Sequence, residues 1–372
     1  MRRHIIIGLI TAPALVLGGG SASAVAALGT TPGVAPRAQN AAAVSPTSCA
    51  VHRLPLPVDT GNVEVTGGDP GGRYLLGRVL PGATAPAPGA PQVVVWRDGL
   101  VDSAPRHPGG LRLDDVNSSG VAVGSAGAYP DAPPSVYRNG VVSPLAGARF
   151  GVATAINENG TIAGVSFVGT DERAVALRWA SAAAEPVVLP LPAGYTLHSV
   201  NGIDEDGTVV GVAARSADAP VGYVWRPDGT GYRLPRPPKT ERLVVTGYEA
   251  ADIRDGKVAV NGWVSDDDGE RALFWAFEYD VRAGRYRKVG PWMGYRWVDA
   301  AAVNASGWLA GGGGLNIASP SFVTDGGAQE LPRLTTPTDV DTVARTLSDD
   351  GRVIGGTASR GDYSEPILWR CV

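Results

Sequence analysis

The stretch INENGTIAG, residues 156–164, is the clearest copy of a pattern that recurs along this chain. It joins an apolar residue, an Asn, two further residues and a Gly, and a second Gly follows after three small or β-branched residues. Asn and Gly favour tight turns, whereas Thr and Ile favour strands. The segment therefore predicts a turn that leads directly into a β-strand.

Six other segments repeat this pattern, two of them with the second Gly displaced. They are DVNSSGVAVG from Asp115, GIDEDGTVVG from Gly202, AVNASGWLAG from Ala302, TLSDDGRVIG from Thr346, and the displaced copies VTGGDPGGRYLLG from Val65 and DIRDGKVAVNG from Asp252. Successive turn glycines lie 40 to 51 residues apart: Gly72, Gly120, Gly160, Gly207, Gly256, Gly307 and Gly351. A period of this length, in a chain with 51 Gly and 30 Pro, is typical of propeller blades.

The second half of each repeat carries an aromatic residue, often beside an Arg. The series is Trp96, Tyr137, Trp179, Trp225, Trp275, Phe322 and Trp369. An Asp-Gly or Asn-Gly turn often follows, and then a Leu-Pro segment, which suits an edge strand because Pro cannot donate to a ladder. Each repeat is therefore predicted to be a four-stranded antiparallel blade. We expect the aromatic residues to pack between blades and the second Gly to let strands approach closely near a central channel.

The phase of the repeat predicts how the ring closes. The last copy stops at residues 369–372, after its third strand, and the missing Leu-Pro strand occurs at residues 51–56. We therefore predict an all-β chain whose residues 49–372 form a single seven-bladed β-propeller of four-stranded antiparallel blades, closed by the N-terminal strand in the last blade. Six or eight blades remain alternatives because two glycines are displaced. An open solenoid would not bring the termini together.

The two cysteines, Cys49 and Cys371, lie at the two ends of this predicted ring. An even number of cysteines in an exported protein suggests a disulfide. The predicted closure places both on adjacent antiparallel strands, where they can bond. Unpaired thiols or an intermolecular bridge are the alternatives.

The first residues of the chain predict export. Arg2 and Arg3 precede an apolar run at residues 5–17 and small residues suited to cleavage, so residues 1–26 are predicted to be a signal peptide. A retained membrane anchor is the alternative. Residues 27–48, rich in Ala and Pro, are predicted to be a flexible spacer. We expect a secreted, extracellular protein with no membrane span after cleavage.

The repeat is similar to a known family. The pattern Ile-Asn-x-x-Gly, followed some twenty residues later by an aromatic residue, Arg and Gly, resembles the bacterial extracellular HAF-type repeat. Residues 156–164 and 303–311 are the closest copies. The resemblance implies export and a propeller-like array, and it carries over no catalytic residues.

Several functional classes lack support in the residues. The formal net charge is −4 and Lys and Arg do not cluster, which disfavours nucleic acid as a partner. His52, His107 and His198 are far apart, so no metal site is predicted from them. The acidic stretches 204–207 and 266–270 are calcium candidates, but we interpret them as self-bonded turns. No Gly-x-Ser-x-Gly motif occurs, and we predict neither catalytic residues nor a cofactor.

Two functions remain. The first is a non-enzymatic binding module, expected to be monomeric, at the bacterial cell exterior, with a glycan, peptide or protein as ligand. Trp292, Tyr295 and Trp297 in the stretch PWMGYRW are its candidate binding residues, although they also suit a core strand, in which Tyr295 and Trp297 share one face. The second is an extracellular polysaccharide hydrolase or lyase. A pair of acids, or a His-Tyr-Arg cluster, converging at one channel mouth would favour that enzyme.

Overall fold

A computed structural model of the chain describes residues 44–372 apart from short gaps. The gaps are residues 59, 81–90, 128–130, 169–172, 216–217, 240–243, 266–272, 290–296, 315–317, 326, 335–340 and 361–362. The predicted signal peptide, residues 1–26, and most of the predicted spacer, residues 27–48, lie outside the described residues. Within the described part, no helix is long and apolar enough to span a membrane.

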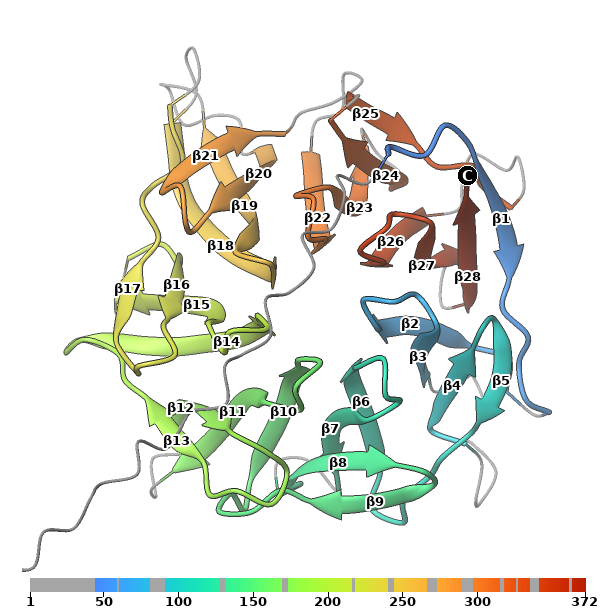
Figure 1. Ribbon diagram of the computed structural model, residues 1–372, viewed down its shortest axis with the longest axis horizontal. Coiled ribbons are helices and arrows are strands. Elements are labelled where there is room, and N and C mark those ends of the chain that lie inside the picture. The colour runs from blue at the N-terminus through green and yellow to red at the C-terminus, as the bar shows by residue number, and fades with distance from the viewer. Residues whose placement is uncertain are drawn as a thin grey trace, which may run out of the picture. The chain divides into compact units, whose positions relative to one another are not determined.

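The described residues form strands only, arranged in seven antiparallel blades of four strands each (Figure 1). Blade 1 contains β2 (Val63–Gly68), β3 (Tyr74–Val79), β4 (Val93–Arg97) and β5 (Leu100–Ser103). Blade 2 contains β6 (Leu111–Val116), β7 (Ala122–Ala126), β8 (Pro134–Arg138) and β9 (Val141–Pro144). Blade 3 contains β10 (Gly151–Ile156), β11 (Ile162–Val168), β12 (Arg173–Trp179) and β13 (Val187–Leu189). Blade 4 contains β14 (Tyr195–Ile203), β15 (Val209–Arg215), β16 (Val221–Trp225) and β17 (Gly231–Arg233).

The remaining blades follow the same order until the seam. Blade 5 contains β18 (Val244–Arg254), β19 (Lys257–Ser265), β20 (Leu273–Asp280) and β21 (Arg285–Lys288). Blade 6 contains β22 (Trp297–Val303), β23 (Leu309–Gly314), β24 (Ser319–Thr324) and β25 (Gly327–Glu330). Blade 7 contains β26 (Asp341–Leu347), β27 (Val353–Arg360), β28 (Tyr363–Cys371) and, as its outer strand, β1 (Cys49–Arg53). Blades 5 and 6 are joined by one parallel pair, Phe274 with Trp297.

The first strand of each blade contacts the first strand of the next, from β2 to β26 and back to β2. These inner strands surround the centre of the ring (Figure 1). Because the blades are antiparallel, the turns after their first and third strands lie on one face, which we call the turn face. The other connections lie on the opposite face. The predicted seven-bladed propeller is confirmed.

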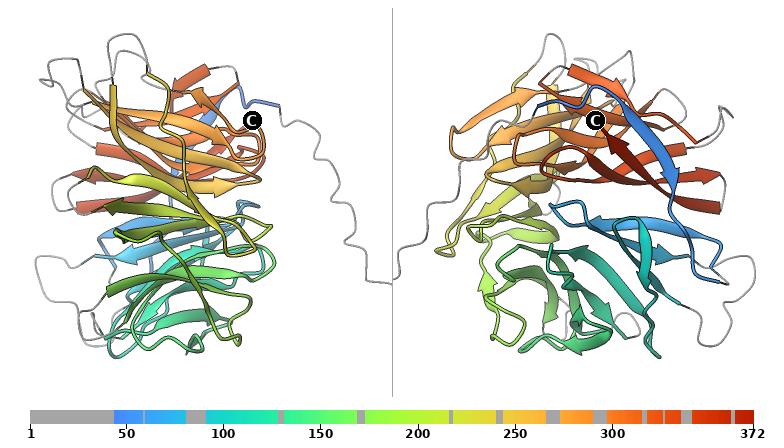
Figure 2. Two further views of the ribbon diagram at one scale, coloured as in Figure 1. Left: turned by 90° about the vertical axis from the view of Figure 1, so that its left-hand side faces the viewer. Right: turned by 45° about the vertical axis from the view of Figure 1, so that its right-hand side comes forward.

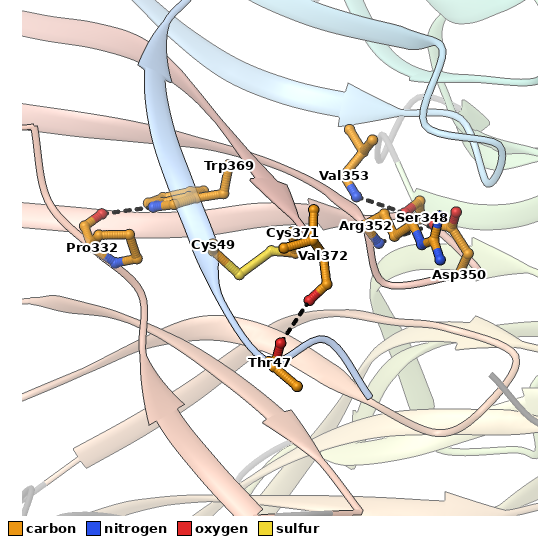
Figure 3. Close-up of a disulfide and its surroundings, with 10 residues drawn as sticks. All are labelled: Thr47, Cys49, Pro332, Ser348, Asp350, Arg352, Val353, Trp369, Cys371 and Val372. Atoms are coloured by element: carbon orange, nitrogen blue, oxygen red, sulfur yellow. Dashed lines mark hydrogen bonds between the residues drawn. A yellow bond between two sulfur atoms is a disulfide. The ribbon is translucent and has the colours of Figure 1, made fainter. Parts of the chain in front are cut away.

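The seam is closed by strand β1, as predicted. It pairs antiparallel with β28 beside the C-terminus (Figure 2). In this pairing Cys49 lies opposite Cys371. The two residues form a disulfide with a Cα–Cα distance of 4.0 Å (Figure 3). The backbone N–H of Thr47 also donates to the carbonyl of Val372 at 2.7 Å, which extends the pairing beyond the disulfide.

The repeat motif forms the turn between the first two strands of each blade. All seven turn glycines have positive φ angles, between 70° and 87°. Gly accepts this conformation without the steric cost that a Cβ would add. In the clearest copy, the side chain of Asn157 accepts the backbone N–H of Thr161 at 2.9 Å and donates to the carbonyl of Asp204 in blade 4 at 2.9 Å. The Asn of the motif therefore both closes its own turn and joins its blade to the next.

The second Gly of the motif lies beside a β-bulge, which the sequence did not predict. The inner strand of each blade contains an extra residue near its turn that breaks the pairing register, and the inner strands of blades 4 and 5 contain a second one, His198 and Thr246. In blade 2, a Cβ added to Gly124 would lie 1.9 Å from the carbonyl oxygen of Arg112 on the bulged strand. The small residue is therefore needed because a displaced backbone, rather than channel crowding alone, approaches it.

The tryptophans pack between blades, as predicted, and they also form hydrogen bonds. Trp96, Trp179, Trp225 and Trp369 are fully buried. Each indole N–H donates to a carbonyl in the segment after the outer strand of the preceding blade, at 2.7–2.9 Å; the acceptors are Pro55, Ala146, Pro190 and Pro332. Figure 3 shows the bond from Trp369 to Pro332. Three of these segments are Leu-Pro pairs that supply both a buried Leu and the acceptor, and in the fourth the acceptor Ala146 follows the buried Leu145.

Blade 5 departs from this arrangement. The sequence placed its aromatic residue at Trp275, but the register puts Tyr279 opposite Val258, the position that Trp225 occupies opposite Val209 in blade 4. The hydroxyl of Tyr286 donates to the carbonyl of Pro235 in blade 4 at 2.6 Å. A tyrosine from the outer strand thus makes the contact that an indole makes in four other blades.

Candidate functional site

The central channel holds a cavity of about 150 Å³ that all seven blades line. In each inner strand, the extra residue of the bulge nearest the turn contributes to its wall. These residues are Thr66, Asp114, Thr154, Asn201, Ala251, Ala301 and Arg345. The bulges therefore give the channel its side chains, because they turn toward it residues that regular pairing would hold against a neighbouring blade.

Two aspartates follow the bulges of blades 2 and 5, and both line this cavity. Asp115 accepts the backbone N–H groups of Val116 and of Ile156 in blade 3, each at 2.8 Å. Asp252 accepts those of Ile253, at 2.8 Å, and of Val303 in blade 6, at 2.9 Å. Each carboxyl group thus joins its own blade to the next.

Burial raises the pKa of Asp115 to about 7 and that of Asp252 to about 7, against the opposing effect of their backbone hydrogen bonds. The negative charge of Asp252 further raises the pKa of Asp115. Both carboxyl groups consequently change protonation near neutral pH. They line one cavity from blades 2 and 5, but each is hydrogen-bonded to backbone N–H groups of its own and the next blade.

Arg254 lies at the turn-face end of the cavity and is only 8% exposed. Its guanidinium donates to Asp349 of blade 7 through Nε at 3.1 Å and Nη2 at 2.9 Å, and to Glu205 of blade 4 through Nη1. Burial opposes its protonation, but these hydrogen bonds and the charges of both acids raise its pKa overall. This arginine joins three blades across the channel.

The partners of Arg254 extend the network to the rest of the ring. Glu205 accepts the backbone N–H of Glu158 in blade 3, and Asp349 accepts that of Ala305 in blade 6. The N–H of Asp349 donates to the carbonyl of Pro70 in blade 1 at 2.8 Å. Ser118 of blade 2 donates its N–H to Glu158 at 3.0 Å and its hydroxyl to Asp69 at 2.6 Å. Side chains and amides from all seven blades therefore meet in one hydrogen-bonded network at this mouth, which we call the mouth network.

A second group of acids lies between blades 5 and 6. The side chain of Asn261 donates to Asp299 at 2.6 Å and also hydrogen-bonds to Glu249. Burial raises the pKa of both acids, and the negative charge of Asp299 raises that of Glu249 further. Asn261 in addition donates to the carbonyl of Ala300 and accepts its N–H, so this polar group fixes the contact between the two blades.

The predicted aromatic site is described only in part. Trp292 and Tyr295 lie outside the described residues, and Trp297 begins β22, where it pairs with Gly314. The backbone of Trp297 also pairs with that of Phe274, whose side chain is 38% exposed. The ring of Phe274 lies 5.8 Å from that of Trp263, edge to face. An aromatic pair, of which Phe274 is exposed and Trp263 is half-buried, therefore lies on blade 5 next to the strand that Trp297 begins.

The ion candidates have other roles where they are described. Asp204 accepts the N–H groups of Glu205, Asp255 and Gly256, so its carboxyl group acts within a turn and between blades. Residues 266–270 lie outside the described part. No group of three or more acidic, His or Cys side chains suited to a metal occurs among the described residues. The two histidines on strands, His52 and His198, belong to blades 7 and 4, and His107 to a connection between blades 1 and 2.

Comparison with known proteins identifies the fold without a family. No family model and no curated protein matches the chain. A prolyl endopeptidase structure has a TM-score of 0.53 at 13% identity, over 84% of this chain and 50% of its own. A puromycin hydrolase scores 0.52 at 16% identity, over 84% and 55%. U3-55K scores 0.51 at 11% identity, over 87% and 98%. The chain is similar to these proteins in being a β-propeller, and it spans about half the length of the two hydrolases.

Sequence reasoning missed most of the channel residues. Arg254 stands where the other copies carry Asp, Asn or Ser, and the turn after it is one residue shorter. That irregularity was visible in the displaced copy from Asp252, and it marks the residue that crosses the channel. The bulges left no comparable signal, because any residue type occupies the extra position.

Proposed function

We propose that this protein is a secreted, non-enzymatic β-propeller that binds a glycan, peptide or protein at the bacterial cell exterior. The proposal rests on the small volume of the channel cavity and on the residues that cross one end of it. Its cavity of about 150 Å³ is smaller than the roughly 300–1,000 Å³ of small-molecule sites. The mouth network crosses the turn-face end of the channel. A polymer segment therefore has no room to enter, and a ligand must bind outside the channel.

The outer surface of blades 5 and 6 supports the same proposal. Phe274 exposes an aromatic ring beside the strand that begins with Trp297, and exposed aromatic residues are suited to ligand contact. We propose Trp292, Tyr295 and Trp297 as contact residues of this binding surface. Monomeric state, export and membership of the HAF-type repeat family belong to the same proposal.

An extracellular polysaccharide hydrolase or lyase is the second candidate. Asp115 and Asp252 favour it, because two carboxyl groups with pKa values of about 7 share one cavity. Their hydrogen bonds weigh against it, since each carboxyl group already binds two backbone N–H groups that hold neighbouring blades together.

A binding screen with product detection separates the two functions. The exported protein is tested against glycans, peptidoglycan fragments and peptides, with and without EDTA, and the supernatant is assayed for new reducing ends and unsaturated sugars. We expect saturable binding without products. Products from the wild type that disappear in Asp115→Asn and Asp252→Asn would establish the enzyme instead. A folded protein that binds nothing in the screen would contradict the proposed function.

A further inference from the structure

A second cavity lies on the turn face between blades 5 and 6, and we call it the 5–6 cleft. Its volume is about 400 Å³, within the range of small-molecule sites. Blade 5 contributes Lys257, Glu278, Asp280, Arg285 and Arg287 to its wall. The cleft is thus larger than the channel cavity and is lined chiefly by charged groups.

The inner acids of this cleft are already bound. Asp280 accepts Lys257 Nζ at 2.6 Å and the N–H groups of Arg282 and Ala283 at 2.9 and 2.8 Å. Glu278, 7% exposed, accepts Arg287 Nε and lies 3.5 Å from Lys257. These two carboxylates neutralise the cations beside them and have little capacity left for a ligand.

The hydrogen-bond donors of the cleft have fewer partners than its two inner acids. Arg285 is exposed on the outer strand β21, and its guanidinium has no hydrogen bond or ion pair within the described part of the chain. Ser306 of blade 6 brings a hydroxyl group whose oxygen makes no hydrogen bond there either. Arg287 Nη1 lies 3.9 Å from Asp325, which is 75% exposed at the rim. Within the described residues, the cleft therefore offers two donor groups without a partner, the Arg285 guanidinium and the Ser306 hydroxyl, and one exposed acceptor, Asp325.

We infer that the 5–6 cleft binds an acidic saccharide through its carboxylate, with Arg285 as the principal contact. Arg binds carboxylates in a bidentate manner, which suits an unpaired guanidinium. Sugar hydroxyl groups can donate to Asp325 and accept from Ser306, whereas an inorganic anion offers acceptors only. A peptide would need apolar anchors, and Tyr286 is the only aromatic group among the described residues that line the cleft. The inference rests on the proposed binding function and names its ligand class.

Titration calorimetry with the full exported protein tests this assignment. The probes are trigalacturonic acid, its methyl ester, hexaglutamate peptide and sodium sulfate. The variant is Arg285→Ala, and the matched control is Arg282→Ala, which removes the same charge from the neighbouring turn but contacts Asp255 outside the cleft. We expect Arg285→Ala to weaken trigalacturonate binding about tenfold or more, as loss of a charge-assisted pair does, and Arg282→Ala to change it less than about twofold.

Each other outcome has a defined meaning. Equal binding of the acid and its methyl ester, or an unchanged affinity in Arg285→Ala, would overturn the cleft assignment and leave the proposed function standing. Tighter binding of hexaglutamate than of trigalacturonate would identify a peptide site. Binding of sulfate as tight as that of trigalacturonate would identify a simple anion site. Either result would overturn the assignment of a saccharide as the ligand. Failure of every ligand in this experiment and in the wider screen would overturn the proposed function itself.

Discussion

Asp115 and Asp252 each hold two blades together with one buried carboxyl group. Their partners include backbone N–H groups of the next blade, Ile156 and Val303, so removing the carboxyl oxygens would take away the acceptors of these donors. The same burial raises both pKa values to about 7. The two side chains that join these blades are therefore also the ones that change protonation near neutral pH.

The stability of the protein should fall as pH rises from about 4 to 7. In the unfolded chain an Asp titrates near a pKa of about 3.9, whereas these two titrate near 7 in the fold. The folded state thus binds more protons in this window, and each carboxyl group contributes a slope of up to about 1.4 kcal/mol per pH unit. Thermal or urea unfolding at several pH values from 4 to 8 measures this dependence of the unfolding free energy on pH.

The matched variant for this titration is Asp252→Asn, which keeps the size of the side chain and one acceptor oxygen. Its unfolding free energy should depend less steeply on pH than that of the wild type. Parallel profiles for the two proteins would show that Asp252 does not titrate in this range.

At the scale of single elements, the hairpin between β18 and β19 differs most from its equivalents. It turns through two residues, Asp255 and Gly256, and Arg254 replaces the Asn, Asp or Ser of the other copies. The shorter turn is compensated from blade 4, because Asp204 accepts the N–H groups of both turn residues. One irregular hairpin thus supplies the only arginine in the mouth network.

Arg254→Ala should lower the unfolding free energy by about 3–5 kcal/mol. The change removes one partner of a buried ion network and leaves Glu205 and Asp349 without their cation. The control, Arg282→Ala, breaks a more exposed ion pair with Asp255 and should cost at most about 1 kcal/mol. Urea denaturation of the three proteins compares them, and similar losses in both variants would contradict a structural role for the mouth network.

At this scale the sequence predicts the regular elements and misses the local deviations. Glycines with positive φ and Leu-Pro edges were recognisable because their chemistry restricts which residues can occupy them. The aromatic residue of blade 5 was misplaced at Trp275, since residue type does not show strand register, which puts Tyr279 at that position. The bulge residues were missed because Thr66, Asp114 and Ala301 have no feature in common.

At the scale of the whole molecule, closure was predictable and the ligand sites were only partly so. The repeat phase and the positions of Cys49 and Cys371 both predict one seam, and the strand pairing agrees with it. The 5–6 cleft could not be foreseen, because Arg285 and Ser306 belong to different blades and line one cavity only when the two blades pack. Blade packing, rather than any motif, brings these side chains together.

Replacement of both cysteines, Cys49→Ser with Cys371→Ser, should destabilise the ring by about 2–5 kcal/mol. The disulfide closes a loop with a sequence separation of 322, and its loss restores conformational freedom to the unfolded chain. Urea denaturation measures the change, with reduced wild type as a second reference. Non-reducing peptide mapping of the wild type should find the two cysteines linked, and free thiols there would contradict the closure.

The outer strand of blade 7 has a consequence for the order of events during synthesis. Strand β1 leaves the ribosome before any other described strand, yet its partner β28 leaves last. The segment after β1 also carries Pro55, whose carbonyl accepts the indole N–H of Trp96, and β1 is fixed in its blade only once β28 pairs with it. Contacts between such distant residues slow folding. A chain truncated before residue 363 would therefore keep an unpaired strand at its beginning, however well its middle blades had assembled.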